Sequence, residues 1–149
     1  MNRDTARELA AQIVFLASHS EGELDEQIDR FFSEEHYSTL QEENEFYAEA
    51  PDEKALGYIR ESVTGVFDHL AEIDGVISKY SASWHIKRIS GMALAILRVA
   101  VYEILYREDV PFGAAINSAV EIDKHYDEPE TAAFVNGVLG GFVRGEGRG

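Results

Sequence analysis

The chain is 149 residues long, carries a formal net charge of −15, and is 45% hydrophobic. This length fits one domain, or two small subdomains that share a core, and the apolar content excludes a chain that is disordered throughout. No apolar run approaches the roughly 20 residues that cross a membrane. The N-terminus has no signal-peptide pattern, and the lack of cysteine excludes disulfides, thiolate nucleophiles and Cys-based zinc sites. We therefore expect a cytoplasmic protein with no membrane association.

The charge is unevenly distributed along the chain. Residues 20–53 contain 13 acidic residues and a single base, Arg30, whereas residues 75–107 contain five bases and one acid, Glu103. The net charge argues against free-standing nucleic-acid binding, but it hides this basic segment. The simplest interpretation of the acidic segment is a solvated face that aids solubility.

Apolar residues repeat at helical spacing in the N-terminal half. Thr5-x-x-Glu8 has the pattern of a capping box. The helix that follows it is predicted to bury a stripe of Ala6, Leu9, Ala10, Ile13, Leu16 and Ala17. A second helix is predicted over 24–35, and a third starts near Asp52, a good N-cap residue. Residues 37–51 are acidic and poorly patterned, so they are predicted to form a mobile connection.

The C-terminal half is helical as well. A short helix is predicted over 73–80, followed by a turn or short helix over 84–89. Ser90 caps the segment MALAILRVAVYEILY, which is apolar nearly all round and should be the central buried helix. Pro111 and Pro129 suit the first turns of the last two helices.

The sequence FVNGVL at residues 134–139 tests this helical interpretation. Asn-Gly between apolar residues is typical of a hairpin turn, but the apolar residues here are spaced by four and no strands flank them. We therefore predict a helix. Gly137 costs about 1 kcal/mol relative to Ala in a helix, so we expect it to permit close approach of a neighbouring helix, with Asn136 bonding across.

The sequence thus predicts an all-α protein of about seven helices, and its motifs point to a family. ILRVAVYEILY, DVPFGAAIN, AVEIDKHY and FVNGVL follow one another over residues 95–139 in an order and spacing that resembles the C-terminal half of NusB, the bacterial transcription antitermination factors. Ala6-Arg7-Glu8 and Gln12 resemble the family's first helix, and Gly65-Val66 resembles its third. The resemblance spans the chain and is weakest over 20–51.

The resemblance implies a fold and a function. The fold would be a NusB-like arrangement of two packed small helical bundles in a single domain, 1–149. We expect an N-terminal subdomain at 1–71, a C-terminal subdomain at 72–143 and a flexible tail at 144–149. The function would be non-enzymatic and need no cofactor: the protein pairs with the ribosomal protein NusE, binds boxA RNA of nascent ribosomal transcripts, and acts in the transcription elongation complex.

The resemblance also assigns residues to RNA. Arg3 and Arg7 match the segment in which the family carries an arginine-rich, RNA-contacting N-terminus, and Arg98 and Lys124 would extend this basic surface. The residues alone leave alternatives open. These are a disordered terminus for Arg3, a surface salt bridge for Arg7, an ion pair of Arg98 with Glu103 or Glu121, and a solvated Lys124.

Phe15 is predicted to contact the protein partner. On a helical wheel it points nearly opposite Leu9 and Ile13, and a large aromatic residue off the core face indicates a second contact surface. The family has an aromatic residue here that contributes to NusE pairing. The alternative is that Phe15 packs beneath the acidic second helix.

Departures from the family pattern leave a second function open. Asp4 and Thr5 stand where many members carry basic residues, which weakens phosphate contacts, and Ser118 replaces a common Glu. Ala93 and Leu94 replace charged or polar residues and add apolar surface, which allows a homodimer that covers the partner face. The alternative function is a NusB-fold interaction scaffold with weakened or lost RNA binding.

The five histidines are scattered, and no set of metal ligands or catalytic residues emerges.

Overall fold

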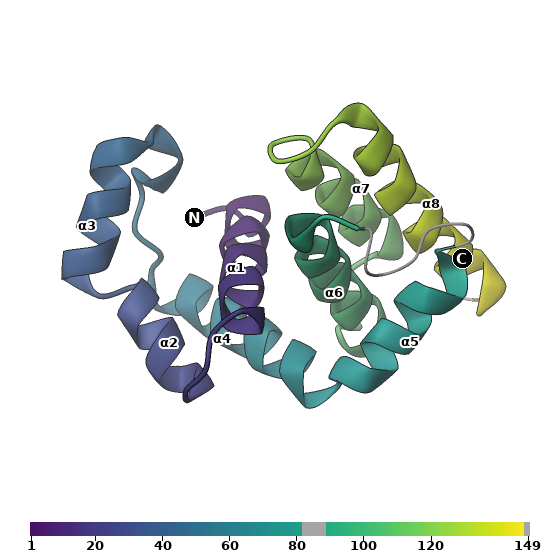
Figure 1. Ribbon diagram of the computed structural model, residues 1–149, viewed down its shortest axis with the longest axis horizontal. Helices are drawn as coiled ribbons and strands as arrows, with labels where there is room; N and C mark the ends of the chain where they lie inside the picture. Colours follow the sequence, from purple (N-terminus) through teal and green to yellow (C-terminus); the bar gives the residue numbers. More distant parts are fainter. Residues whose placement is uncertain (82–88, 148–149) are drawn as a thin grey trace.

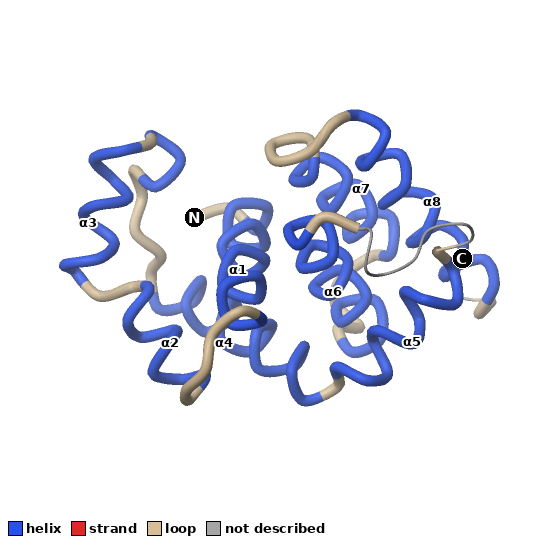
Figure 2. Tube along the Cα trace, in the orientation of Figure 1, coloured by secondary structure: helices blue, strands red, loops and turns tan. Residues whose placement is uncertain are grey.

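The computed structural model describes residues 1–81 and 89–147, and every regular element in them is helical (Figures 1 and 2). The all-α prediction is confirmed for this part of the chain. The predicted turn over 84–89 falls outside it, apart from Ile89. The elements are α1 (Arg3–Ser18), α2 (Leu24–Phe31), α3 (Glu34–Glu43), the 3₁₀ turn η1 (Glu45–Tyr47), α4 (Glu53–Asp68), α5 (Leu70–Tyr80), α6 (Gly91–Tyr106), α7 (Phe112–Asp123) and α8 (Pro129–Gly145).

Side-chain caps define where three of the long helices begin. The Asp52 carboxylate accepts a hydrogen bond from the Ala55 amide at 2.9 Å, and the Ser90 hydroxyl accepts one from the Ala93 amide at 3.0 Å, as predicted. The predicted capping box at Thr5 is wrong. Asn2 is the N-cap of α1, and its side chain accepts from the Thr5 amide at 2.8 Å. The helix therefore starts earlier than its apolar pattern does.

The acidic segment is more ordered than predicted. The predicted helix over 24–35 breaks after Phe31, and Ser33 caps a new helix, α3, so neither that single helix nor the mobile connection over 37–51 exists. Aromatic packing holds the segment together, because the Tyr37 ring meets the Tyr47 ring edge-on at a centroid distance of 5.9 Å. We call residues 24–47, comprising α2, α3 and η1, the acidic arm; its outer part stands apart from the remaining helices in Figure 1.

Helix α6 is the central buried helix, as predicted, and most of its side chains are buried. It packs against α1, α4, α5, α7 and α8, and α1 also packs against α4 (Figure 1). The close approach of α4 to α6 depends on Gly65, since a Cβ at this position would overlap the Tyr102 ring. The predicted apolar stripe of α1 ends before Leu16, which is 46% exposed.

Helix α8 contains FVNGVL, as predicted, but its glycines act elsewhere. A Cβ on Gly137 would meet nothing within 4 Å, and Asn136 is exposed, so the predicted close approach at this point is wrong. The close approach occurs at Gly145, where a Cβ would lie 2.6 Å from the hydroxyl of Tyr80 on α5. Because α8 continues to Gly145, the predicted flexible tail does not begin at Arg144.

Two further expectations concern the whole chain. The predicted boundary between residues 71 and 72 lies in the first turn of α5, and the division into two subdomains stays a prediction. Within the described ranges, no helix combines the length and apolar character that crossing a membrane requires.

Candidate nucleic-acid and partner interfaces

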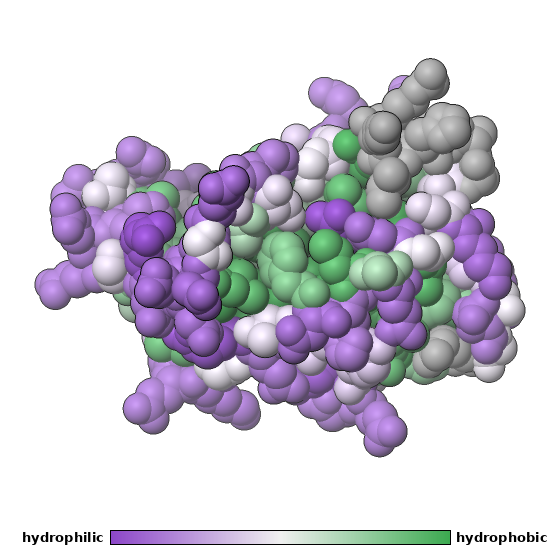
Figure 3. Space-filling model, turned by 60° about the horizontal axis from the view of Figure 1, so that its bottom comes forward, coloured by the Kyte–Doolittle hydropathy of each residue, from purple (hydrophilic) through white to green (hydrophobic). Residues whose placement is uncertain are grey.

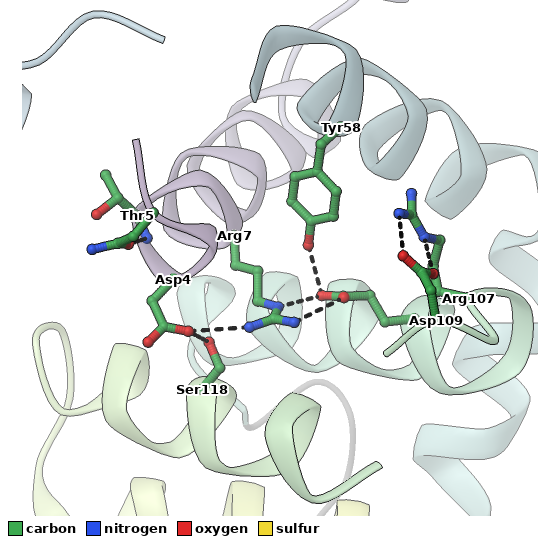
Figure 4. A network of polar contacts seen from close by, with 9 residues as sticks. Asp4, Thr5, Arg7, Tyr58, Arg107, Asp109 and Ser118 are labelled. Carbon is green, nitrogen blue, oxygen red and sulfur yellow. Dashed lines mark hydrogen bonds and ion pairs between the residues drawn. The ribbon is translucent and has the colours of Figure 1, made fainter. Parts of the chain in front are cut away.

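A buried ion pair joins three helices at the centre of the protein (Figure 4). Arg7 on α1 donates from Nε to Oε1 of Glu103 on α6 at 2.8 Å, and from Nη2 to Oε2 at 3.3 Å. The hydroxyl of Tyr58, on α4, donates to Oε1 of Glu103 at 2.8 Å. Glu103 is fully buried, and both of its carboxylate oxygens accept hydrogen bonds, which offsets the cost of burying this group.

The ion pair extends to α7 through a residue that departs from the family pattern. Arg7 donates from Nη1 to Oδ1 of Asp4 at 3.1 Å, and the hydroxyl of Ser118 donates to the same oxygen at 2.8 Å (Figure 4). Asp4 and Ser118 were noted separately in the sequence. The structure shows that they form one contact between α1 and α7.

This geometry does not suit Arg7 for contacting RNA. Arg7 is only 8% exposed, and its guanidinium is engaged by Glu103 and Asp4. Burial alone would lower the pKa of Arg7, but the hydrogen bond with Glu103 and the charges of Glu103, Tyr58 and Asp4 together outweigh that effect and raise the pKa. The alternative of a surface salt bridge does not fit either, because the pair with Glu103 lies in the core.

Arg3 is held in place above the buried pair. Its guanidinium carbon lies 4.1 Å from the centre of the Tyr58 ring, a cation–π arrangement, so the alternative of a disordered terminus does not fit. Beside it is a cleft of about 230 Å³ into which the N-terminal ends of α1 and α4 face. The exposed Lys54 also lines this cleft. Sequence analysis missed Lys54, because only the packing of α4 against α1 brings it close to Arg3.

The other two predicted RNA residues lie elsewhere. Arg98 donates from Nε and Nη2 to the two carboxylate oxygens of Asp74 on α5, each at 2.9 Å, so neither Glu103 nor Glu121 is its partner. Its Nη1 bonds to Ser18, at the far end of α1 from Arg3, roughly 22 Å away along the helix. Lys124 is exposed after the end of α7 and pairs with Glu121 at 2.9 Å. The four predicted residues therefore do not form one surface.

Phe15 sits against the N-terminus of α6. A Cβ on Gly91 would come within 2.5 Å of the Phe15 ring, so the ring occupies the space that Gly91 leaves. The ring also lies 4.7 Å from the ring of His19. The alternative of packing beneath α2 is thus not what anchors it. Gly91 is a second residue that sequence analysis missed.

Phe15 opens onto a groove of about 670 Å³ between the acidic arm and the remaining helices, which we call the body of the protein. The body contributes Phe15, Gly91 and Met92, among others, and the acidic arm contributes Leu40 and Tyr47. Figure 3 shows one face of the molecule, on which a band of hydrophobic residues is flanked by hydrophilic ones. Apolar surface of this kind is typical of a protein-binding site.

A hydrogen-bond network fixes Tyr126, a third missed residue, at the edge of this groove. Its hydroxyl donates to Glu8 Oε2 at 2.6 Å and accepts from Gln12 Nε2 at 2.7 Å. Glu8 also bonds His125 at 2.8 Å, and Tyr47 of the acidic arm donates to Gln12 at 3.1 Å. Burial and the hydrogen bond to Glu8 raise the pKa of Tyr126, so its hydroxyl remains a donor at neutral pH.

One buried carboxyl near the groove has no hydrogen-bond partner. Asp123, the last residue of α7, is fully buried, and neither of its oxygens is bonded within the described part of the chain. Burial, together with the neighbouring Asp127, raises the pKa of Asp123 to about 8. Asp127 in turn accepts from the hydroxyl of Ser90 at 3.0 Å and lines the groove. The Asp123 carboxyl is therefore protonated more readily than an exposed aspartate.

Comparison with known proteins identifies the family. The model of the NusB family matches residues 4–144. The chain belongs to the NusB family. It is 38% identical to the transcription antitermination protein NusB of Acetivibrio thermocellus over 144 residues, which cover 97% of this chain and 90% of that protein. The NusB of Thermodesulfovibrio yellowstonii is 37% identical over 143 residues, with 93% and 89% coverage.

Solved structures agree with the family assignment. The crystal structure of T. maritima NusB superposes with a TM-score of 0.76 and 26% identity, covering 96% of this chain and 92% of that one. The predicted NusB-like fold is thus confirmed. Because NusB proteins are transcription antitermination factors, the prediction of a non-enzymatic protein is confirmed as well.

The buried ion pair generates a stability prediction. Arg7→Ala should lower the free energy of unfolding by about 3–5 kcal/mol, because it leaves the Glu103 carboxylate buried without a cation. Urea denaturation would measure the loss. The double variant Arg7→Met/Glu103→Gln should recover most of it, since a neutral amide still accepts from Tyr58. Arg60→Ala, which removes exposed ion pairs, should cost only about 0–1 kcal/mol. If Arg7→Ala instead kept its full stability and bound RNA more weakly, the result would support the predicted RNA contact of Arg7.

Asp123 generates a prediction of pH dependence. In the unfolded chain an Asp carboxyl loses its proton near pH 4 (about 3.9), whereas the folded protein holds it until about pH 8. The contribution of Asp123 to the free energy of unfolding therefore falls as the pH rises from about 4 to about 8. Asp123→Asn removes that fall, so the variant should gain stability relative to the wild type between pH 5 and pH 8 in urea titrations. A difference that stayed constant with pH would mean that Asp123 is ionised in the folded protein.

Proposed function

We propose that this protein is a transcription antitermination factor of the cytoplasm that pairs with the ribosomal protein NusE and, as a pair, binds boxA RNA in the elongation complex. The observation that carries the proposal is the groove at Phe15, an apolar site on a NusB-family chain whose net charge is −15. The names of the relatives support the antitermination role.

We assign RNA binding to the cleft between α1 and α4. Arg3 presents a guanidinium that is positioned by the Tyr58 ring, and Lys54 adds a second cation on the opposite wall. Arg7 acts indirectly, because it holds the Glu103 carboxylate to which Tyr58 donates. Lys124 is exposed and remains a proposed outer contact. Arg98 is the least favoured direct RNA contact among the predicted residues, since its guanidinium already pairs with the Asp74 carboxylate.

The small number of cations explains why a partner is required. Each phosphate contact contributes to affinity by releasing counterions, and this chain offers few cations against a net charge of −15. A basic protein that docks at the groove would offset that charge and extend the RNA-binding surface. RNA binding by the pair and not by the chain alone is therefore the expected behaviour.

The RNA cleft is tested by Arg3→Ala and Lys54→Ala. Each should weaken boxA binding by the pair about threefold to tenfold and lower the slope of log affinity against log salt by about 0.7, the value for one single-stranded phosphate contact. Fluorescence anisotropy of labelled RNA at several salt concentrations measures both quantities. Arg144→Ala, in the last turn of α8, is the control that removes a cation elsewhere. Binding that is absent at every salt concentration, despite a formed pair, would favour the scaffold function.

The partner groove is tested by Phe15→Asp. A carboxylate against Gly91 should abolish NusE pairing in isothermal titration calorimetry, because it places a desolvated charge in an apolar site. Leu105→Asp, a charge introduced into a half-buried position near the C-terminal end of α6 that does not line the groove, controls for folding and for added charge. Circular dichroism should show the same helicity in both variants. Normal pairing by a folded Phe15→Asp protein would refute the site.

A further inference from the structure

We propose that the acidic arm is the second wall of the groove at Phe15, and that the groove takes a basic amphipathic segment of a protein partner. This inference rests on the proposed function for the identity of the natural partner, but its chemistry concerns the acidic arm. The sequence suggested only a solvated face for that segment, and the function assigned above makes no use of it.

The groove has two walls of different origin. One wall belongs to the body of the protein and includes Phe15 and Met92. The other belongs to the acidic arm, from which α3 contributes His36 and Leu40 and η1 contributes Tyr47. The hydrogen bond from Tyr47 to Gln12 connects the two walls at one end. A segment lying in the groove would therefore touch the acidic arm along its length.

The carboxylates on the outer part of the arm are not used for folding. Two acids of α2 pair with Arg60. By contrast, five exposed acids of α3 and η1 have no ion pair within the described ranges: Glu34, Glu35, Glu42, Glu43 and Glu45. Their mutual repulsion costs stability, so a cation that binds among them would be attracted strongly.

This negative charge reaches the groove itself. Burial raises the pKa of Tyr47, and the nearby carboxylates of Glu8 and Glu43 add to the rise. Asp127 lines the opposite wall. The only base that the sequence offers on the acidic arm, Arg30, lies on α2 and not on α3 or η1. The groove is thus largely apolar, and Asp127, Glu8 and Glu43 bring negative charge to its edge.

These properties select the occupant. Apolar side chains are needed to cover Phe15, Met92 and Leu40, and cations are needed to meet the negative charge at the edge. A helix or strand with leucine-like residues on one face and lysine or arginine beside them satisfies both requirements. RNA is disfavoured because its phosphates would face the carboxylates. A second copy of this chain is disfavoured because it would bring the same negative charge at the edge and a further net charge of −15.

The two methionines of the chain offer a direct readout. Met92 lines the groove, whereas Met1 lines the RNA cleft. With methyl-labelled methionine, titration of a helical Leu/Lys peptide should shift the NMR signal of Met92 and leave that of Met1 in place. A titration with boxA RNA that shifted Met92, or dilution that shifted Met92 through a dimer, would overturn the proposed occupant.

Matched charge removals test the role of the acidic arm. Glu43→Gln/Glu45→Gln should weaken peptide binding about tenfold at 0.05 M salt and about twofold at 0.5 M, since screening shortens the range of the attraction. Asp68→Asn/Glu108→Gln removes the same charge near the opposite end of α6 and should change affinity less than twofold. Equal losses in the two double variants would mean that only net charge matters, and would refute the second wall.

The same titrations with NusE separate this proposal from the proposed function. Binding of the peptide at Met92 without binding of NusE would overturn the assigned partner but keep the groove chemistry. Binding of NusE that is lost in Phe15→Asp and unchanged in Glu43→Gln/Glu45→Gln would keep the partner and overturn the role of the arm.

Discussion

The buried pair of Arg7 and Glu103 is the interaction on which the rest of the structure depends. It lies where α1, α4 and α6 meet, and Glu103 accepts from both Arg7 and Tyr58. A charged group in a core is costly unless its partners are present, so this pair ties the relative positions of three helices to one another. It explains why a helix as apolar as α6 carries a single acidic residue, Glu103, in its last turn.

The pair also organises the surface above it. Tyr58 is fixed by its bond to Glu103, and its ring carries the guanidinium of Arg3. Through Tyr58, the buried Glu103 carboxylate thus positions the guanidinium of Arg3 near the N-terminus. On the α7 side, Asp4 accepts hydrogen bonds from both Arg7 and Ser118. Asp4 is thus part of what holds the first helix in place.

Separation of charge is the second organising feature. Arg3 and Lys54 lie together at the N-terminal ends of α1 and α4, whereas five exposed carboxylates that have no ion pair within the described residues lie on α3 and η1 of the acidic arm. Between them is an apolar groove at Phe15. In the function that we propose, this separation would let a protein of net charge −15 attract a basic partner to one site and leave the other open to RNA.

The sequence by itself determined the all-α fold, the caps at Asp52 and Ser90, the central buried helix and the family, because helical periodicity and cap chemistry are local and the family motifs are long. Only the tertiary structure decided how the acidic segment folds, since its aromatic contacts, such as that of Tyr37 with Tyr47, join residues of different helices. Only packing could seat Phe15 on Gly91. The same holds for charge: the sequence showed Arg7 as a cation, but whether it meets RNA or a buried carboxylate depends on which helix lies against it.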